Sequence, residues 1–354
     1  MDVESISRFF KLDGENVTVS PFGRGHINTT YRVKTDEQEY VLQKINHQVF
    51  KRVDQLMDNI VRVTQYLNGQ IDETEYETIQ LIPTHNGNFF HQCQDGNYWR
   101  MYIFKSHLHA FEFPKNLNQV YESARAFGRF LAYLKDFPVD QIQITIPNFH
   151  NVKFRLTQLH QALNLDIAGR KSGIARWTDY AFYLSDQMMT IERLGEKGRI
   201  PIRVIHNDCK FNNALLDERD HGRCIIDLDT IMPGYVHYDF GDGIRTTTST
   251  AKEDEADLSL IEIDRSRFAS FTAGYLDATR TLLNPVEVKY LGISGALLSY
   301  LMGVRFLTDY LNGDQYYKVA FDDHNLVRAR AQLTLTQVHL AQLDELNDVV
   351  KRLS

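Results

Sequence analysis

The sequence is poor in cysteine and in clustered positive charge. Three cysteines, Cys93, Cys209 and Cys224, occur in 354 residues, and none lie in CxxC spacing. An odd, unspaced set argues against a disulfide framework or a zinc site and fits a reducing cytoplasm. The formal net charge is −7, and no run of basic residues exceeds two. A nucleic-acid binder is therefore not expected, since such proteins neutralise phosphates with a basic face.

The N-terminus also lacks a targeting pattern. MDVESISRFFKL places Asp2 and Glu4 ahead of any apolar run, whereas a secretory signal begins with basic residues followed by an apolar stretch. No uninterrupted apolar stretch approaches the ~18 residues that cross a bilayer. We expect a cytoplasmic protein with neither a membrane nor a nucleic acid as partner.

The chain is long enough for two lobes. It has 354 residues, whereas a single hydrophobic core stops growing at about 250 to 300. The first hundred residues alternate apolar and polar side chains, as short strands do. Strands are predicted over 17–22, 29–34, 39–44, 78–82 and 98–104. One amphipathic helix interrupts them, with apolar residues spaced by three or four from Val49 to Leu67 and Gly69 to end it.

Beyond about residue 108 the apolar spacing becomes that of long helices. Helices are predicted over 116–136, 177–195, 284–311 and 325–352. Asn284-Pro285 is typical of a helix start and Asn312-Gly313 of a helix end. Short strand-like runs interrupt this region only at 201–230. The patterns predict an α+β fold with a small sheet lobe followed by a larger, mostly helical lobe.

Polar side chains are densest in HNDCKFNNALLDERDHGRCIIDLDT, residues 206–230. His206-x-Asp208-x4-Asn213 repeats the spacing by which protein kinases place an aspartate near the attacking hydroxyl and an amide near Mg²⁺. Asp227 ends the next apolar run, and Mg²⁺ prefers carboxylate and amide oxygens. Each aspartate alone is better explained as a turn residue of a hairpin. The combination indicates phosphoryl transfer.

The blocks HNDCKFNN and IIDLDT resemble the catalytic segment of the aminoglycoside phosphotransferase and choline kinase superfamily. GRGHINTTYRV, IIDLDTIMPG, DFGD and RFLTDYLNGD are similar to blocks of bacterial N-acetylhexosamine 1-kinases, in the same order along nearly the whole chain. The resemblance implies a protein-kinase-like fold that uses ATP and Mg²⁺ to phosphorylate the anomeric hydroxyl of a small-molecule sugar substrate, an N-acetylhexosamine. It implies an N-terminal nucleotide-binding lobe over 1–103, a linker over 104–108 and a C-terminal lobe over 109–354.

The resemblance also implies roles for single residues. Asp208 is expected to be the catalytic base and to contact the substrate, with Asn213 and Asp227 as magnesium ligands and Asp229 in or next to the metal shell. His206 is expected to brace the loop rather than to transfer a proton. Further substrate contacts are expected from His26, Asp242, Arg305 and Tyr316.

The nucleotide side departs from the kinase pattern. Kinase folds place a lysine on the third strand to pair with nucleotide phosphates, but this position is Gln43, and strand alternation puts Lys44 on the opposite face. Arg24, the metal or a helix end could supply the missing positive charge. Glycines between two predicted strands can approach phosphates closely, and the linker is expected to bind adenine. The predicted nucleotide-binding residues are Gly23, Arg24, Gly25, Gln43, Phe104 and Ser106.

HYDFGDGIR, residues 237–245, contains Asp239-Phe240-Gly241, which matches the metal-binding triplet of protein kinases. We assign the metal to Asp227 instead, because a short hairpin after Asn213 returns it directly, whereas Pro233-Gly234 turns the chain away before Asp239. We expect Asp239 to brace the catalytic loop. No segment with an APE-like ending follows, so a small polyhydroxylated ligand is favoured over a peptide.

Two alternatives stay open at this point. One is a kinase of another small alcohol, such as an aminoglycoside, choline, homoserine or methylthioribose. The other is a pseudokinase that binds nucleotide or sugar without turnover, which the missing lysine favours and Asp208, Asn213 and Asp227 oppose. The preference between GlcNAc and GalNAc, and the oligomeric state, are likewise open.

Overall fold

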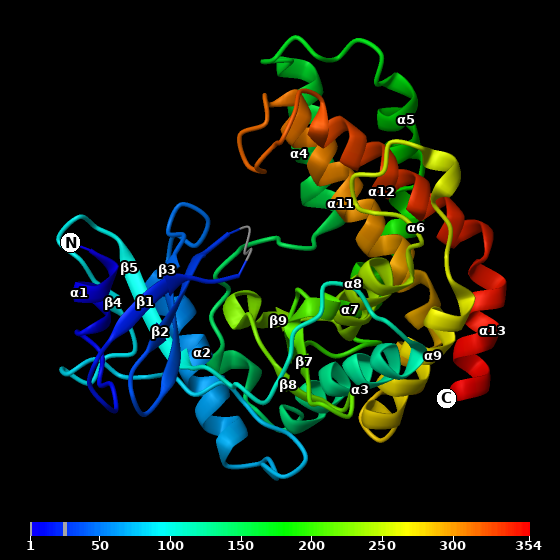
Figure 1. Cartoon of the computed structure of the whole chain (residues 1–354). Helices are drawn as coiled ribbons and strands as arrows, with labels where there is room; N and C mark the ends of the chain where they lie inside the picture. Colours follow the sequence, from blue (N-terminus) through cyan, green and yellow to red (C-terminus); the bar gives the residue numbers. More distant parts are fainter. Residues whose placement is uncertain (1, 24–26) are drawn as a thin grey trace.

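The computed structural model describes residues 2–23 and 27–354. A sheet lobe and a larger helical lobe lie next to each other (Figure 1). This confirms the predicted kinase-like α+β fold. The predicted nucleotide-binding residues Arg24 and Gly25 and the predicted substrate residue His26 lie outside the described residues.

The N-lobe is built on a five-stranded antiparallel sheet in the order β1-β2-β3-β5-β4. Its strands are β1 (Thr18–Pro21), β2 (Thr29–Lys34), β3 (Glu39–Ile45), β4 (His91–Gln92) and β5 (Tyr98–Ile103), accompanied by helices α1 (Val3–Ser7) and α2 (Val53–Asn68). One face of the sheet buries Tyr40, Leu42 and Met101 against Ile6 and Phe10. The other face carries Gln43, and it turns toward the catalytic segment.

The strand predicted over 78–82 does not form. The segment has a single isolated bridge, Leu81 to Tyr102, although Gln80 and Ile82 exchange backbone hydrogen bonds with β5. Four residues earlier, Glu77 bridges to Cys224 of the helical lobe. The segment is held between the two lobes and cannot follow β5 for long. The short strand β4, which was not predicted, takes the edge of the sheet instead.

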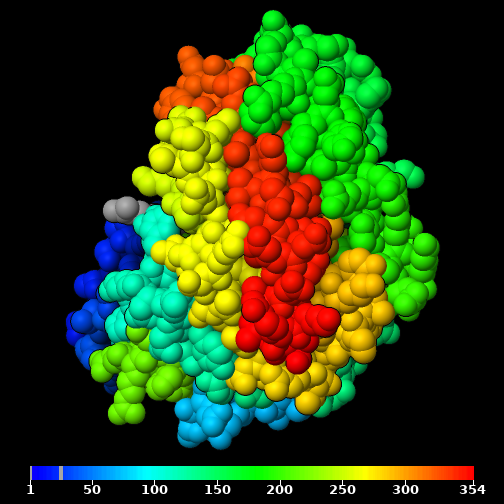
Figure 2. Space-filling model, turned by 90° about the vertical axis from the view of Figure 1, so that its right-hand side faces the viewer, coloured from blue at the N-terminus to red at the C-terminus, as the bar shows by residue number. Residues whose placement is uncertain are grey.

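The C-lobe contains the predicted long helices, most of them in pieces. Its helices are α3 (Leu117–Tyr133), α4 (Val152–Leu165), α5 (Ala175–Tyr183), α6 (Ser185–Met188), α7 (Thr190–Glu196), α8 (Val236–Thr248), α9 (Arg265–Thr279), α10 (Pro285–Lys289), α11 (Ser294–Leu311), α12 (His324–Ala341) and α13 (Leu343–Leu353). The predicted start at Asn284 is a capping box with Glu287, and Asn312 caps the end of α11. Figure 2 shows α12 and α13, in red, along the face away from the N-lobe.

Three short strands lie where the sequence predicted an interruption, at 201–230, and a fourth follows directly after it. They are β6 (Arg203–Ile205), β7 (Ala214–Leu216), β8 (Gly222–Ile225) and β9 (Met232–Gly234). β6 pairs with β9, and β7 with β8, both antiparallel. Helix α2 shares one buried apolar cluster with these strands and with α3, so the core is continuous from the N-lobe helix into the C-lobe.

One stretch, Leu291–Leu311, is long and apolar enough to cross a bilayer by length and composition alone, contrary to the expectation from the sequence. Its most apolar part is 83% buried inside the protein. It belongs to α11 and packs in the centre of the C-lobe, as a core helix does.

Candidate active site

The predicted hairpin forms and brings the phosphoryl-transfer residues together. β6 leads into the loop that carries Asp208, and a short 3₁₀ turn, Phe211–Asn213, opens β7. After β8 the amide of Ile226 donates to the carbonyl of Asn213 at 2.9 Å. This bond fixes Asp227 beside Asn213, as the spacing predicted.

Asp208 is held by two neighbours. Its Oδ2 accepts from Lys210 Nζ at 2.9 Å, and its backbone carbonyl accepts from Asn213 Nδ2 at 2.8 Å. Burial raises the pKa of the Asp208 carboxyl, but the Lys210 ammonium outweighs burial and the net pKa is lowered. Asp208 is therefore ionised at neutral pH and able to orient a hydroxyl. Lys210 was not among the predicted site residues, although it lies two residues after the predicted base.

The loop around Asp208 is braced as expected. His206 is fully buried; its Nδ1 accepts from the Asp208 amide at 3.2 Å, so the proton sits on Nε2, which donates to the Ile226 carbonyl at 2.9 Å. From the first turn of α8, the Asp239 carboxylate accepts from the amides of His206 at 2.9 Å and Asn207 at 2.6 Å. Asn207 takes a φ of 66°, a left-handed conformation that asparagine tolerates. The DFG-like triplet thus supports the loop.

Asn213 and Asp227 suit a magnesium ion that is bound mainly through phosphates and water. The Nδ2 of Asn213 is directed at Asp208, and its Oδ1 has no hydrogen-bond partner within residues 2–23 and 27–354. Burial, followed by the negative charges of Asp229 and Asp208, raises the pKa of Asp227 to about 6. In the same residues, no cluster of three or more His, Cys, Asp or Glu side chains is arranged around a metal. Two protein ligands are what Mg²⁺ on a nucleotide requires.

Asp229 is fully engaged by the N-lobe. It is 4% exposed, and its Oδ1 forms an ion pair with Arg100 Nη1 on β5. Its Oδ2 accepts from Asn28 Nδ2 at 2.6 Å. Each oxygen of Asp229 thus has one partner from the N-lobe, so Asp229 links the lobes, and its predicted place in or next to the metal shell stays a prediction.

On the nucleotide side, Gln43 lies on the sheet face that turns toward Asp229, and Lys44 lies on the other face. Gln43 is paired in register with Arg100, whereas Lys44 is paired with Trp99. The buried residues of α2 include Asn59, whose side chain exchanges hydrogen bonds of 2.8 Å with the backbone of Gln143 in the C-lobe, as donor and as acceptor.

The linker begins where β5 ends. The Phe104 ring packs edge-on against the Phe22 ring, with centroids 5.5 Å apart. Gly23, the residue after Phe22, has a φ of 74°. The backbone amide of Phe104 already donates to the Glu39 carbonyl at 2.9 Å. Within the described chain the amide of Ser106 has no partner, so of the two predicted linker contacts only Ser106 offers a free backbone donor.

On the opposite side of Asp208, Asp242 lies on α8 and is 4% exposed. Its Oδ1 accepts from Arg245 Nε and Nη2 at 3.0 and 2.8 Å, while its buried Oδ2 has no partner. Burial raises the pKa of Asp242, and the negative charge of Asp208 raises it further. An unsatisfied buried carboxylate oxygen near the base is a position that a ligand donor can fill.

Arg305 and Tyr316 converge on an aromatic wall beside Asp208. The Arg305 guanidinium lies over the rings of Phe149, Tyr317 and Tyr316, at 5.1, 5.6 and 5.9 Å from their centroids. Within residues 2–23 and 27–354 it has no carboxylate partner. Tyr316 is 53% exposed, so its ring is available to a ligand.

Two further polar residues of this wall were not predicted. His150 is buried, and burial followed by the positive charge of Arg305 lowers its pKa to about 3, so it is neutral. Arg155 is held by the Phe149 carbonyl at 2.9 Å, and burial together with Arg305 lowers its pKa to about 10. Neither lies in a motif of the chain, and only the packing of α4 against α11 brings them here.

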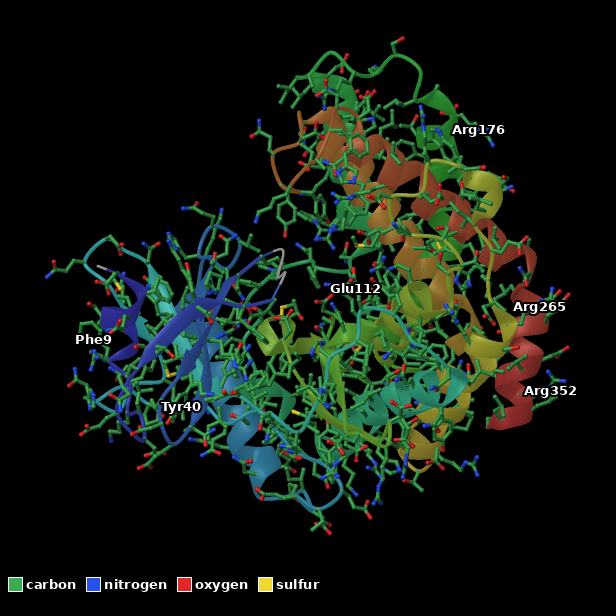
Figure 3. The ribbon with its side chains drawn as sticks, viewed as in Figure 1. Phe9, Tyr40, Glu112, Arg176, Arg265 and Arg352 are labelled. Atoms are coloured by element: carbon green, nitrogen blue, oxygen red, sulfur yellow. The ribbon has the colours of Figure 1, made fainter. Side chains whose placement is uncertain are left out.

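Glu112 lies on the segment that connects β5 to α3. Figure 3 labels it on the segment that enters the C-lobe, between the two lobes, whereas Arg176, Arg265 and Arg352 lie on the outer side of the C-lobe.

The model of the phosphotransferase enzyme family matches residues 18–271 of the chain. The matched part contains the N-lobe sheet, the loop of Asp208, the hairpin and α8. It ends within α9, before Arg305 and Tyr316.

Solved structures share the fold over nearly the whole chain. An aminoglycoside phosphotransferase from Alicyclobacillus acidocaldarius has a TM-score of 0.63 at 13% identity and covers 98% of this chain and 95% of its own. A spectinomycin phosphotransferase, in complex with ADP and spectinomycin, has a TM-score of 0.61 at 15% identity, covering 96% and 97%. A microcompartment-associated aminopropanol kinase has a TM-score of 0.60 at 14% identity, covering 97% of each chain.

Proposed function

Because the chain belongs to the phosphotransferase enzyme family, we propose that it transfers the γ-phosphoryl group of ATP to the anomeric hydroxyl of an N-acetylhexosamine, forming the sugar 1-phosphate. The observation that carries this proposal is the convergence of Asp208, Asn213 and Asp227 at one end of the β7–β8 hairpin. The residues serve as base and metal ligands in kinases that share this spacing.

Asp208 acts as the base. Its carboxylate is ionised, accepts a hydrogen bond from the sugar hydroxyl, and takes the proton as the new oxygen–phosphorus bond forms and the bond from the γ-phosphorus to the bridging oxygen breaks, which releases ADP. Lys210, at 2.9 Å from Asp208, keeps that carboxylate in place and adds positive charge where negative charge moves during transfer. Most of the rate enhancement comes from positioning and electrostatics, as is usual for this reaction.

Asn213 Oδ1 and Asp227 would hold Mg²⁺, which offsets charge on the nucleotide phosphates when bound. Asp227 takes a φ of 62°, in the left-handed region, and it lies close enough to Asp229 for the charge of that residue to raise its pKa. Asp227 offers its carboxylate to the site, while Asp229 serves the N-lobe.

The acceptor side supports a neutral, polyhydroxylated ligand. Asp242 Oδ2 is a buried acceptor in want of a donor, which a sugar hydroxyl or acetamido N–H can supply. Arg305 without a carboxylate partner suits a carbonyl or hydroxyl oxygen and repels a cation. Cationic acceptors such as aminoglycosides or choline are disfavoured by this pair of positive charges, Arg155 and Arg305.

A coupled assay of ADP release tests the proposal. The purified protein is screened against GlcNAc, GalNAc, glucose, an aminoglycoside, choline and homoserine, and the product is checked for a 1-phosphate. N-acetylhexosamines are expected to have the highest kcat/KM. Turnover of a cationic alcohol in preference to both sugars would replace the substrate assignment, and ATP binding without turnover of any acceptor would favour the pseudokinase.

A further inference from the structure

The N-lobe lacks the lysine that kinase folds place against the nucleotide phosphates, since Gln43 occupies its position. The nearest lysine, Lys44, points to the outer face of the sheet. A different polar group on the same face of the sheet as Gln43 would take over part of this role. The following inference rests on the proposed use of ATP, but not on which acceptor is phosphorylated.

An arginine lies directly beside Gln43. The antiparallel register of β3 and β5 pairs Gln43 with Arg100, so both side chains leave the same face of the sheet. Gln43 Oε1 accepts from Arg100 Nε at 3.1 Å and Nη2 at 2.7 Å, and from the Tyr102 hydroxyl. The third guanidinium nitrogen, Nη1, forms the ion pair with Asp229.

This network fixes which way the Gln43 amide points. A guanidinium only donates hydrogen bonds, so the atom of Gln43 that faces Arg100 must be the oxygen. Nε2 is consequently turned away, with one N–H directed at Thr30 Oγ1 at 3.1 Å. In the part of the chain that the structure describes, the second N–H has no partner, and Gln43 is only half-buried. The amide is a preorganised donor.

Arg100 carries the charge that Gln43 lacks. Its side chain is 2% exposed, and the carboxylates that act on it belong to Asp229 and Asp227. In protein kinases the strand lysine is likewise paired with a carboxylate. Here the cation is Arg100 on β5, the strand next to β3. Its carboxylate partner, Asp229, belongs to the segment that follows the β7–β8 hairpin.

We propose that Gln43 and Arg100 together form the phosphate-binding element of the N-lobe. Gln43 donates its free N–H to a nucleotide phosphate oxygen. Arg100 is a positioning residue: its guanidinium orients this amide and polarises it, and its own charge is balanced by Asp229. The neighbouring ion pair with Asp229 ties this element to the catalytic segment.

The test compares adenosine, ADP and ATP binding by titration calorimetry on the full chain, without acceptor. Gln43→Met and the charge-balanced double variant Arg100→Met/Asp229→Asn are measured beside Lys44→Met, which alters the next residue of β3 on the other face. In the first two, ATP and ADP are expected to bind at least tenfold more weakly than to wild type, while adenosine stays within about twofold. Lys44→Met is expected to bind all three as wild type does.

The phosphate dependence distinguishes this role from a structural one. If Gln43→Met weakened adenosine and ATP equally, or left ATP unchanged, the inference would be overturned. Should the double variant not fold, Gln43→Met decides the matter, because its side chain lies outside the buried core. A wild-type protein that binds no ATP would overturn the proposed function and this inference together, whereas turnover of an unexpected acceptor would leave the inference standing.

Discussion

At the scale of single residues, five of the seven aspartates from position 208 to 242 lie at the candidate site, and they differ in their hydrogen-bond partners. Asp208 is held by a lysine, and Asp227 has no hydrogen-bond partner in the described residues. Asp229 is engaged by an arginine, Asp239 by two backbone amides, and Asp242 by an arginine on one oxygen only. We therefore propose different roles for the same side chain: base, metal ligand, lobe link, loop brace and ligand acceptor.

Asp208→Asn tests the base. The amide cannot accept the proton, so kcat is expected to fall by about 10²- to 10⁴-fold, with ATP affinity nearly unchanged. Steady-state kinetics with the preferred sugar, together with calorimetric ATP titration, measure both. Retention of half the activity would exclude Asp208 as the base.

Asp227→Ala and Asp239→Ala form a contrasting pair. The first removes a metal ligand, so activity is expected to disappear at every magnesium concentration while the melting temperature changes little. The second leaves two buried amides without an acceptor, at a cost of about 1–3 kcal/mol each, so the melting temperature is expected to fall. Magnesium titrations of the initial rate and thermal melts measure the two effects. If magnesium dependence followed Asp239 and ignored Asp227, the metal assignment would be reversed.

At the scale of elements, the aromatic wall around Arg305, on which we propose that the sugar binds (the acceptor wall), depends on the connection between α11 and α12. Asp309, 6% exposed near the end of α11, accepts from the amides of Gln315 at 3.0 Å, Tyr316 at 2.9 Å and Tyr317 at 2.9 Å. It also accepts from Asn325 Nδ2, in the first turn of α12, at 3.0 Å. One carboxylate thus shapes the loop that presents Tyr316.

Asp309→Ala is expected to raise the KM for the sugar by tenfold or more and to leave the KM for ATP within about twofold, because only the acceptor wall loses its support. Asp322→Ala, an exposed aspartate of the same connection, is the matched control and is expected to behave as wild type. Kinetics with each substrate varied in turn separate the two constants. Equal changes in both would show that Asp309 supports the fold at large.

At the scale of the whole molecule, the lobes are joined by more than the linker. Asn59 of α2 bonds to Gln143 and to the Ile231 carbonyl, and Asp229 receives Arg100 and Asn28 from the N-lobe. These contacts meet the segment that follows the hairpin, so the sheet is positioned relative to the metal ligands. The C-lobe core adds buried histidines that carry no role in the proposed chemistry.

Those histidines predict loss of stability in acid. Burial lowers the pKa of His339 to about 3 and that of His237 to about 4, against about 6.5 in the unfolded chain. The unfolded state then binds more protons, so their contribution is fully present above pH 6.5 and is lost as the pH falls toward 4. At pH 5 each of the two histidines lowers the free energy of unfolding by about 2 kcal/mol relative to neutral pH.

Denaturant unfolding between pH 7.5 and 5 measures this slope. His339→Leu is expected to reduce the dependence of the free energy of unfolding on pH, because leucine does not titrate. The substitution breaks no hydrogen bond, since neither ring nitrogen of His339 has a partner in the described residues. An unchanged slope in that variant would mean that His339 is not the titrating group.

The sequence alone determined the two-lobe division, most helices and the catalytic segment. The lobes and helices follow from the local periodicity of apolar residues. The catalytic segment follows from the spacing of Asp208, Asn213 and Asp227 around one hairpin. The strand predicted over 78–82 was wrong because its backbone is shared between two lobes, which no local pattern reveals. Continuous helices were predicted where packing breaks them, as at Tyr290 between α10 and α11.

Only the tertiary structure decided the partners of the charged groups. Gln43 and Arg100 are 57 residues apart, and Arg100 and Asp229 are 129 apart. The sequence showed that β3 has Gln43 where kinases have a lysine, but only the register of β3 and β5 shows that Arg100 lies beside Gln43. Asp227 and Asp229, two residues apart in the chain, likewise have different partners. The electrostatic environment of a carboxylate is set by the groups that packing brings to it rather than by its neighbours in sequence.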